Sequence, residues 1–95
     1  GMRLETVDAV MGGKYELPEG VYVTEVLMGS PAMYAGIKNG DIITNVGITP
    51  VSDVRQFYEE ISKVGTQSVR IIVSRDAKGE RKEQTLYITP ETRLH

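Results

Sequence analysis

Ser30 and Asp41 are the residues of this chain whose surroundings most resemble sites of chemistry. Ser30 lies in the run Gly-Ser-Pro-Ala, where a serine beside a glycine could serve as a nucleophile. A serine nucleophile needs a histidine base, and the one histidine, His95, is the last residue, where chains fray. Serine is, however, a preferred helix N-cap, and Pro31 suits the first position of a helix. We therefore predict that Ser30 and Pro31 begin a short helix, and we assign no catalytic residue.

The glycine-rich stretch from Gly36 to Asp41 could instead cradle a phosphate. Phosphate loops place a pattern such as G-x-G-x-x-G between a strand and a long helix, whereas this stretch follows a short helical segment and enters an apolar run. Gly36 fits the left-handed position that ends a helix, and Gly40 supplies the positive φ of a tight turn. Asp41 can accept hydrogen bonds from nearby backbone N–H groups. We predict turn and cap roles for these residues, and no cofactor.

Composition excludes several further classes of site. The 95 residues contain no cysteine, which removes disulfides, zinc fingers and thiol catalysis. The carboxylates are scattered without a metal-binding spacing, so we expect no metal site. Eleven Lys and Arg residues interleave with 13 Asp and Glu residues, which leaves no basic face for nucleic acid. No apolar run approaches the ~18 residues of a membrane span, so direct membrane insertion is not expected.

Periodicity and turn residues place these motifs on short strands and two helices. Residues 20–27 alternate and are rich in β-branched side chains, which predicts a strand. Residues 54–64 carry apolar side chains at the i, i+3, i+4, i+7 spacing of a helix, with Ser52 or Asp53 as its cap and Gly65 at its end. Further strands are predicted at residues 41–46, 68–75 and 82–89, with a turn at 76–80 and a possible strand start within 2–11. The order predicts an α+β, mainly β domain: a small β-barrel or sandwich of five to six strands, capped by one short and one long helix.

Several of these segments, taken together, resemble a PDZ domain. They are Gly20-Val21-Tyr22-Val23, Gly29-Ser30-Pro31-Ala32, Ala35-Gly36-Ile37 and Gly40-Asp41-Ile42-Ile43-Thr44. They are most similar to the circularly permuted PDZ domain attached to bacterial HtrA/DegP-type trypsin-like serine proteases. The resemblance is strongest over about residues 19–88 and implies a single PDZ domain over residues 1–95. The opening Gly1-Met2 can be a tag remnant followed by a start, which would make the chain a piece excised from a longer protease, or it can be native sequence. The resemblance also implies an extracytoplasmic location in a bacterium, with the parent protease domain as a partner in cis.

The resemblance implies a peptide-binding module with no catalytic residue of its own. PDZ domains hold an extended peptide, usually a free C-terminus, as an added strand between a sheet edge and the long helix. The expected ligands are C-terminal or unfolded peptide segments with apolar ends, which regulate an HtrA-like protease or deliver substrate to it. In the permuted form, backbone N–H groups of a Φ-G-Φ loop take the carboxylate, and Gly1-Met2 is the candidate here. The residues expected to bind peptide are Met2, Arg3, Leu4 and Glu5 on the edge strand, and Val54, Tyr58, Ile61 and Ser62 on the helix side.

Alternatives stay open for both the helix and the function. Either Val54, Tyr58 and Ile61 face the groove while Phe57 and Val64 enter the core, or all five pack into the core. An apolar Val54, in place of the histidine of some PDZ domains, favours ligands with an apolar side chain two residues before the end. The same fold could serve a C-terminal processing protease, a site-2-type metalloprotease or a non-proteolytic adaptor. It could also act as a scaffold with an empty groove.

Overall fold

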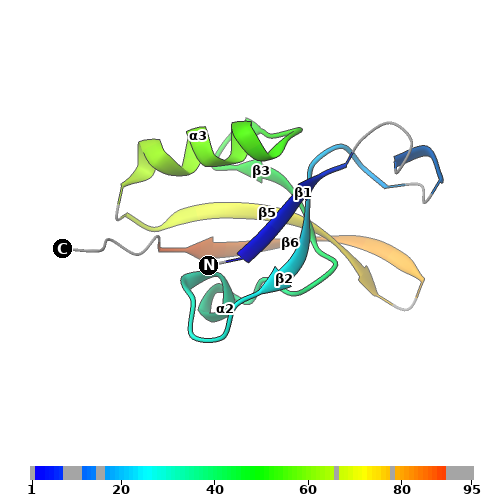
Figure 1. The fold of residues 1–95 in the computed structure, drawn as a ribbon, viewed down its shortest axis with the longest axis horizontal. Coiled ribbons are helices and arrows are strands. Elements are labelled where there is room, and N and C mark those ends of the chain that lie inside the picture. Colours follow the sequence, from blue (N-terminus) through cyan, green and yellow to red (C-terminus); the bar gives the residue numbers. More distant parts are fainter. Residues whose placement is uncertain (1, 8–11, 15–16, 66, 78, 90–95) are drawn as a thin grey trace.

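Strands dominate the computed structural model, which describes residues 2–7, 12–14, 17–65, 67–77 and 79–89 (Figure 1). The sequence predictions for Gly1, for residues 8–11 and for His95 therefore lie outside the described residues. Residues 12–14 are helical. The elements that follow in chain order are β1 (Met2–Thr6), β2 (Val21–Val26), α2 (Pro31–Ala35), β3 (Ile42–Val46), β4 (Thr49–Pro50), α3 (Val54–Val64), β5 (Val69–Ala77) and β6 (Glu80–Ile88).

The six strands of the described residues belong to one antiparallel sheet. Its order is β1-β2-β3-β5-β6, with β4 paired to β3 beside this path, so β1 and β6 form the two edges. In Figure 1, α3 lies along the top of the strands and α2 lies below them. The long helix contacts β1 and β3, and the short one contacts β6. This mainly β architecture confirms the predicted fold class, and α2 and α3 are the predicted short and long helices. The helical segment at residues 12–14 was not predicted.

The core forms where alternating strand residues meet α3 and α2. Val21 and Val23 of β2 are fully buried, whereas Tyr22 and Thr24 between them point to the other face and are half-buried. This period of two is the signature of a strand with one buried face. The central cluster contains Val21, Val23, Ala32, Ile37, Ile43, Val46, Val51, Phe57, Ile71, Val73 and Ile88.

Gly20 allows β2 to start close against β3. A Cβ atom on Gly20 would lie 2.5 Å from the carbonyl oxygen of Ile43 and 2.8 Å from the Cγ2 atom of Ile42. Real Cβ atoms do not approach backbone oxygen so closely, and a close-packed interior has no room to yield. Only glycine fits at this position, because a side chain would collide with β3.

The short helix begins and ends as the capping rules predict. Ser30 is its N-cap and accepts a hydrogen bond from the Met33 N–H at 3.3 Å, with Pro31 in the first turn. Gly36 follows the helix with φ 93°, in the left-handed region that favours glycine. The side chain of Ala32 is buried and anchors α2 in the core.

The long helix is capped by Asp53, whose carboxylate accepts the Gln56 N–H at 2.7 Å. Phe57 is its one fully buried residue among those described and lies in the central cluster, as predicted. Val64 differs from the expectation, because it is half-buried and lies outside that cluster. It occupies the last position of the helix, where the chain is about to leave the core.

The β5–β6 hairpin is longer than predicted. Its strands extend to Ala77 and from Glu80, and these two residues pair directly. The predicted turn at residues 76–80 is thus shortened to the residues between them. Gly79 has φ 83°, and a positive φ is what a tight hairpin turn needs.

Candidate functional site

The first strand, β1, presents two chemically different faces. Met2 and Leu4 are half-buried and pack against the central cluster, whereas Arg3 and Glu5 are exposed on the opposite face. Because successive side chains of a strand alternate, the apolar pair faces the core side and the charged pair faces solvent. The four residues predicted to bind peptide on this strand thus divide into two apolar and two charged positions.

The backbone of β1 also divides into an inner and an outer edge. Toward β2, the Val7 N–H donates to the Gly20 carbonyl at 3.0 Å, and the Arg3 carbonyl accepts the Thr24 hydroxyl at 3.1 Å. The N–H and C=O groups of one strand residue point the same way, and this direction alternates along the strand. Met2, Leu4 and Thr6 therefore direct their backbone groups toward the outer edge.

Leu4 illustrates this directly through its partner on β2. Leu4 pairs in register with Val23. The Val23 N–H donates to the Asp41 carbonyl at 2.8 Å, and the Val23 carbonyl accepts the Gly40 N–H at 2.8 Å. Both backbone groups of Val23 are thus turned away from β1. The N–H and C=O of Leu4 are left facing the outer edge of the sheet, where another strand can bond to them.

The long helix flanks this outer edge with apolar side chains. Val54 and Ile61 are half-buried and pack against the central cluster. Tyr58 is 53% exposed, and its ring forms a T-shaped pair with the Phe57 ring at a centroid distance of 5.5 Å. Neither interpretation of the helix holds in full. Phe57 is buried in the central cluster, Val64 is half-buried outside it, and Val54, Tyr58 and Ile61 each keep exposed surface. We name Met2, Leu4, Val54, Tyr58 and Ile61 the β1–α3 surface.

A hydrogen bond joins the two sides of this surface at one end. The Thr6 hydroxyl oxygen accepts the Val54 N–H at 3.1 Å, which fixes the end of β1 to the start of α3. From that point the strand and the helix diverge in Figure 1. Thr6 directly follows the predicted residues Met2 to Glu5, but sequence reasoning missed it. Its partner Val54 lies 48 positions away, and no local pattern joins the two.

Ser62 has a more limited role than predicted, and the prediction for Gly1 is not addressed by the described residues. Ser62 is exposed, and its hydroxyl donates to the Glu59 carbonyl at 2.8 Å, so its hydrogen atom is used within the helix. Gly1, the candidate for the carboxylate-binding loop, lies outside the described residues.

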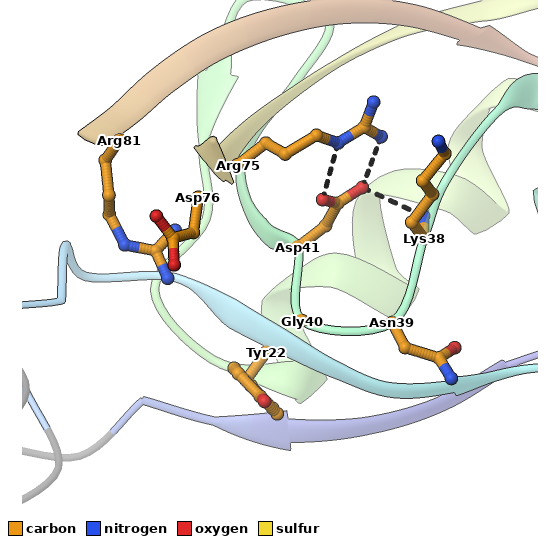
Figure 2. Close-up of a pocket in the computed structure, with 8 residues that line it drawn as sticks. All are labelled: Tyr22, Lys38, Asn39, Gly40, Asp41, Arg75, Asp76 and Arg81. Atoms are coloured by element: carbon orange, nitrogen blue, oxygen red, sulfur yellow. Dashed lines mark hydrogen bonds and ion pairs between the residues drawn. The ribbon is translucent and has the colours of Figure 1, made fainter. Parts of the chain in front are cut away.

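Asp41 lies away from the β1–α3 surface, in a second polar region (Figure 2). It is 1% exposed and accepts the Lys38 N–H at 2.9 Å, which agrees with the turn role expected for it. It also accepts the Arg75 Nε at 2.8 Å and the Arg75 Nη2 at 2.6 Å, a partner that the sequence did not reveal. Arg75 Nη2 donates in addition to the Gly36 carbonyl at 2.8 Å. These hydrogen bonds to the Asp41 carboxylate raise the pKa of the Arg75 guanidinium above its usual value.

A hollow of about 480 Å³ adjoins this ion pair (Figure 2). It is lined by Tyr22, Lys38, Asn39, Gly40, Asp41, Arg75, Asp76 and Arg81. Asp41 is turned toward Arg75 and the Lys38 backbone, so its oxygens are already occupied. The pair joins the turn before β3 to β5, which is a structural role.

Neither a metal-binding cluster nor a membrane-spanning helix is found in the described part of the chain. Within it, no group of three or more His, Cys, Asp or Glu residues is placed to hold a metal ion. No helix among these same residues is both long enough and apolar enough to cross a membrane.

Comparison with known proteins places this geometry in a family. The chain is 32% identical over 76 residues to the mitochondrial serine protease HTRA2 of Bos taurus, which covers 80% of this chain and 15% of that protein. It is 38% identical over 80 residues to the serine protease Do-like HtrB of Bacillus subtilis, covering 81% of this chain and 17% of that protein. The chain therefore spans about a sixth of the length of these relatives.

Solved structures give the same answer. The crystal structure of the HtrA3 PDZ domain bound to a phage-derived ligand, FGRWV, matches with a TM-score of 0.79 at 28% identity and covers 96% of this chain and 82% of that one. The HtrA-type protease AlgW S227A with a decapeptide matches with a TM-score of 0.77 at 23% identity, which supports the fold alone, over 94% of this chain and 27% of that one. The resemblance to HtrA-type PDZ domains is thus confirmed. The family model described as "PDZ domain" matches residues 1–86, and this chain belongs to the PDZ domain family.

Proposed function

We propose that this PDZ domain captures the C-terminal or unfolded segment of another polypeptide as an added strand between β1 and α3. The observation that carries this proposal is the outer edge of β1, where the Leu4 N–H and C=O face away from β2. A peptide laid along this edge forms main-chain hydrogen bonds with it, and alternate side chains enter the space beside the helix.

The apolar composition of the β1–α3 surface supports a ligand with an apolar end. Met2, Leu4, Val54 and Ile61 are half-buried side chains that already pack against the core and have surface left to cover. Covering apolar surface contributes roughly 25 cal/mol per Å². The ligand of the similar HtrA3 PDZ domain, FGRWV, ends in valine, which agrees with this expectation.

The comparisons also support an association with an HtrA-like serine protease. We propose that the parent protein carries its catalytic domain outside these 95 residues, and that the PDZ domain regulates it or delivers substrate to it. The curated relatives of which this chain spans a small part are serine proteases. By the resemblance to bacterial HtrA-type proteases, such as HtrB of Bacillus subtilis, we propose an extracytoplasmic location in a bacterium.

Binding of matched peptides tests whether the domain recognises the free carboxylate of a captured C-terminus. A pentapeptide ending in valine with a free carboxylate is compared, by fluorescence polarisation, with the same peptide ending in an amide. We expect the amide to bind at least about tenfold more weakly, because hydrogen bonds to a charged group contribute about 1.5–3 kcal/mol. Equal binding of the two peptides would refute carboxylate capture.

A pair of tyrosine variants locates the bound peptide. Tyr58 on α3 and Tyr34 on α2 are both exposed, at 53% and 77%, but only Tyr58 belongs to the β1–α3 surface. Tyr58→Ala is expected to weaken the valine peptide about fivefold, which corresponds to about 1 kcal/mol. Tyr34→Ala is expected to leave the affinity unchanged. The reverse pattern would place the peptide elsewhere.

A further inference from the structure

The exposed face of β1 carries two opposite charges at fixed positions, Arg3 and Glu5. We propose that these two side chains select the charges of the captured peptide. The preferred ligand carries a basic residue, then any residue, then an acidic residue, then the apolar C-terminal residue. This inference rests on the proposed function and extends it from an apolar end to a defined charge order.

Arg3 lies opposite one carboxylate on the neighbouring strand β2, that of Glu25. A bulge in the β1–β2 pairing, next to Thr24, brings Glu25 opposite Arg3 on the exposed face. The Arg3 Nε lies 3.1 Å from the Glu25 Oε2, and the two side chains are 77% and 50% exposed. A guanidinium has five N–H donors in a planar fork, and this contact uses the Nε end of it. The remaining N–H groups of Arg3 can therefore donate hydrogen bonds to a second carboxylate.

Glu5, in contrast, has no positively charged residue opposite it on β2. Its cross-strand partner is Tyr22. Among the residues that the structure describes, no ion pair of Glu5 is found. Its carboxylate is exposed and remains available to a basic side chain on the other side of β1.

The backbone geometry places a ligand side chain next to each of these residues. Leu4 faces the outer edge and would exchange hydrogen bonds with one ligand residue, whose neighbours then lie opposite Arg3 and Glu5. The backbone groups of Arg3, and of Glu5 two positions on, point toward β2. The pairs that these two residues form with the ligand are therefore non-hydrogen-bonded pairs. Cα atoms in such pairs are about 4.5 Å apart, closer than in the hydrogen-bonded pairs. Opposite charges there attract, and like charges repel.

The direction of the ligand fixes the order of the two charges. A carboxylate bound before β1 makes the ligand antiparallel to this strand, with its last residue near Met2. The penultimate residue then lies opposite Arg3, and the residue two positions upstream lies opposite Glu5. An acidic penultimate residue places a second carboxylate beside Arg3, on the side away from Glu25. A basic residue two positions upstream pairs with the Glu5 carboxylate.

Two peptides of identical composition test this order. Labelled Ala-Lys-Ala-Glu-Val and Ala-Glu-Ala-Lys-Val have the same net charge and the same apolar end. We expect the first to bind about tenfold more tightly at low ionic strength, because each exposed pair changes from attraction to repulsion. The ratio is expected to fall toward one in about 1 M salt, where the Debye length is about 3 Å.

Charge-swapped variants connect the preference to β1. The variant Arg3→Glu with Glu5→Arg and Glu25→Lys keeps a cross-strand ion pair and is expected to prefer the second peptide. A control variant, Lys82→Glu with Glu83→Lys, exchanges exposed charges on the opposite edge strand β6 and is expected to keep the preference of the native chain. Thermal unfolding of each variant checks that it is folded.

The outcomes separate this inference from the proposed function. Equal binding of both peptides to the native chain, or an unchanged preference in the swapped variant, overturns the charge order while peptide capture stands. Failure of both peptides to bind overturns the proposed function and this inference with it. Reversal of the peptide preference in the charge-swapped variant, but not in the control variant, supports the inference.

Discussion

Asp41 is the one charged side chain that is buried among the described residues, and Arg75 is its counter-ion. The Arg75 side chain is 23% exposed and that of Asp41 is 2% exposed, so water compensates little for the loss of either partner. Arg75→Leu leaves the carboxylate buried without its partner and is expected to lower the free energy of unfolding by about 3 kcal/mol. Urea unfolding measures this loss.

The control for Arg75 is another arginine ion pair. Arg55 bonds Glu59 one turn along α3 at 3.1 Å, but its side chain is 89% exposed. Arg55→Leu is expected to change stability by less than about 0.5 kcal/mol, because exposed pairs contribute little. Similar losses in both variants would show that burial does not set the importance of the Asp41–Arg75 pair.

Gly20 gives a second prediction at the scale of a residue. A methyl group there would lie 2.5 Å from the Ile43 carbonyl oxygen, so Gly20→Ala forces β2 and β3 apart. We expect a loss of about 2 kcal/mol in thermal or urea unfolding. Gly13 is the matched control, because a Cβ atom there meets nothing within 4 Å. A Gly20→Ala variant as stable as Gly13→Ala would contradict the close approach.

Glu60 and Lys63 on α3 give a prediction of pH dependence. The Lys63 ammonium lies 2.9 Å from the Glu60 carboxylate, and this hydrogen bond lowers the pKa of Glu60 below its usual value of 4.5. A carboxyl group whose pKa is lowered by folding stabilises the protein above its unfolded pKa, and this contribution is lost as the pH falls through the folded pKa.

The Lys63→Met variant tests that pH dependence. It is expected to be less stable than the native chain at pH 7, and the two unfolding curves should converge as the pH falls below 4.5. A stability difference that persists unchanged at pH 2 would exclude the Glu60 titration as its source.

At the scale of elements, β1 helps to cap α3. The first N–H groups of a helix have no partner within it. Asp53 satisfies the Gln56 N–H from the helix's own cap position, while Thr6 satisfies the Val54 N–H from a separate strand. One hydrogen bond thus stabilises the helix and also sets the distance between the strand and the helix at one end of the β1–α3 surface.

Replacement of Thr6 by Val or Ser tests this cap. Val has nearly the same shape without the hydroxyl, and Thr6→Val is expected to cost about 1 kcal/mol of stability and to speed hydrogen exchange of the Val54 amide. Thr6→Ser retains the oxygen and should keep the Val54 amide protected. Equal exchange of that amide in the two variants would contradict the capping role.

Capping preferences and apolar periodicity predicted the helices and strands, but they did not predict contacts between residues far apart in the sequence. Ser30 and Gly36 bound α2 because their capping preferences depend on the next few residues alone. The apolar spacing of residues 54–64 likewise predicted α3 and its buried Phe57. The Asp41–Arg75 pair and the Thr6–Val54 hydrogen bond join residues 34 and 48 positions apart, and no local pattern encodes such pairs.

The candidate site shows the same division. The resemblance to a PDZ domain led to Met2, Arg3, Leu4 and Glu5 on β1 and to Val54, Tyr58, Ile61 and Ser62 on α3. In the structure α3 contacts β1, and Met2, Leu4, Val54 and Ile61 pack against the same central cluster. The bulge that aligns Arg3 with Glu25 depends on the pairing of two strands far apart in the sequence, which periodicity within either strand does not reveal.

In the molecule as a whole, the two edges of the sheet differ in their protection. The outer strand β6 exposes Lys82, Glu83 and Gln84, and charged side chains of this kind discourage pairing with another strand. The outer strand β1 instead lies beside α3, which supplies apolar surface along its edge. The molecule thus leaves β1 as the edge suited to an added strand.

Amide hydrogen exchange of Leu4, with and without a bound valine-ending peptide, tests strand addition most directly. The Leu4 N–H faces the outer edge of β1, so its exchange is expected to slow at least about tenfold at saturating peptide, with β6 amides much less affected. Val7, whose N–H already donates to the Gly20 carbonyl, serves as the internal reference. Unchanged exchange at Leu4 together with slowed exchange along β6 would show that the peptide binds the opposite edge and would contradict the account.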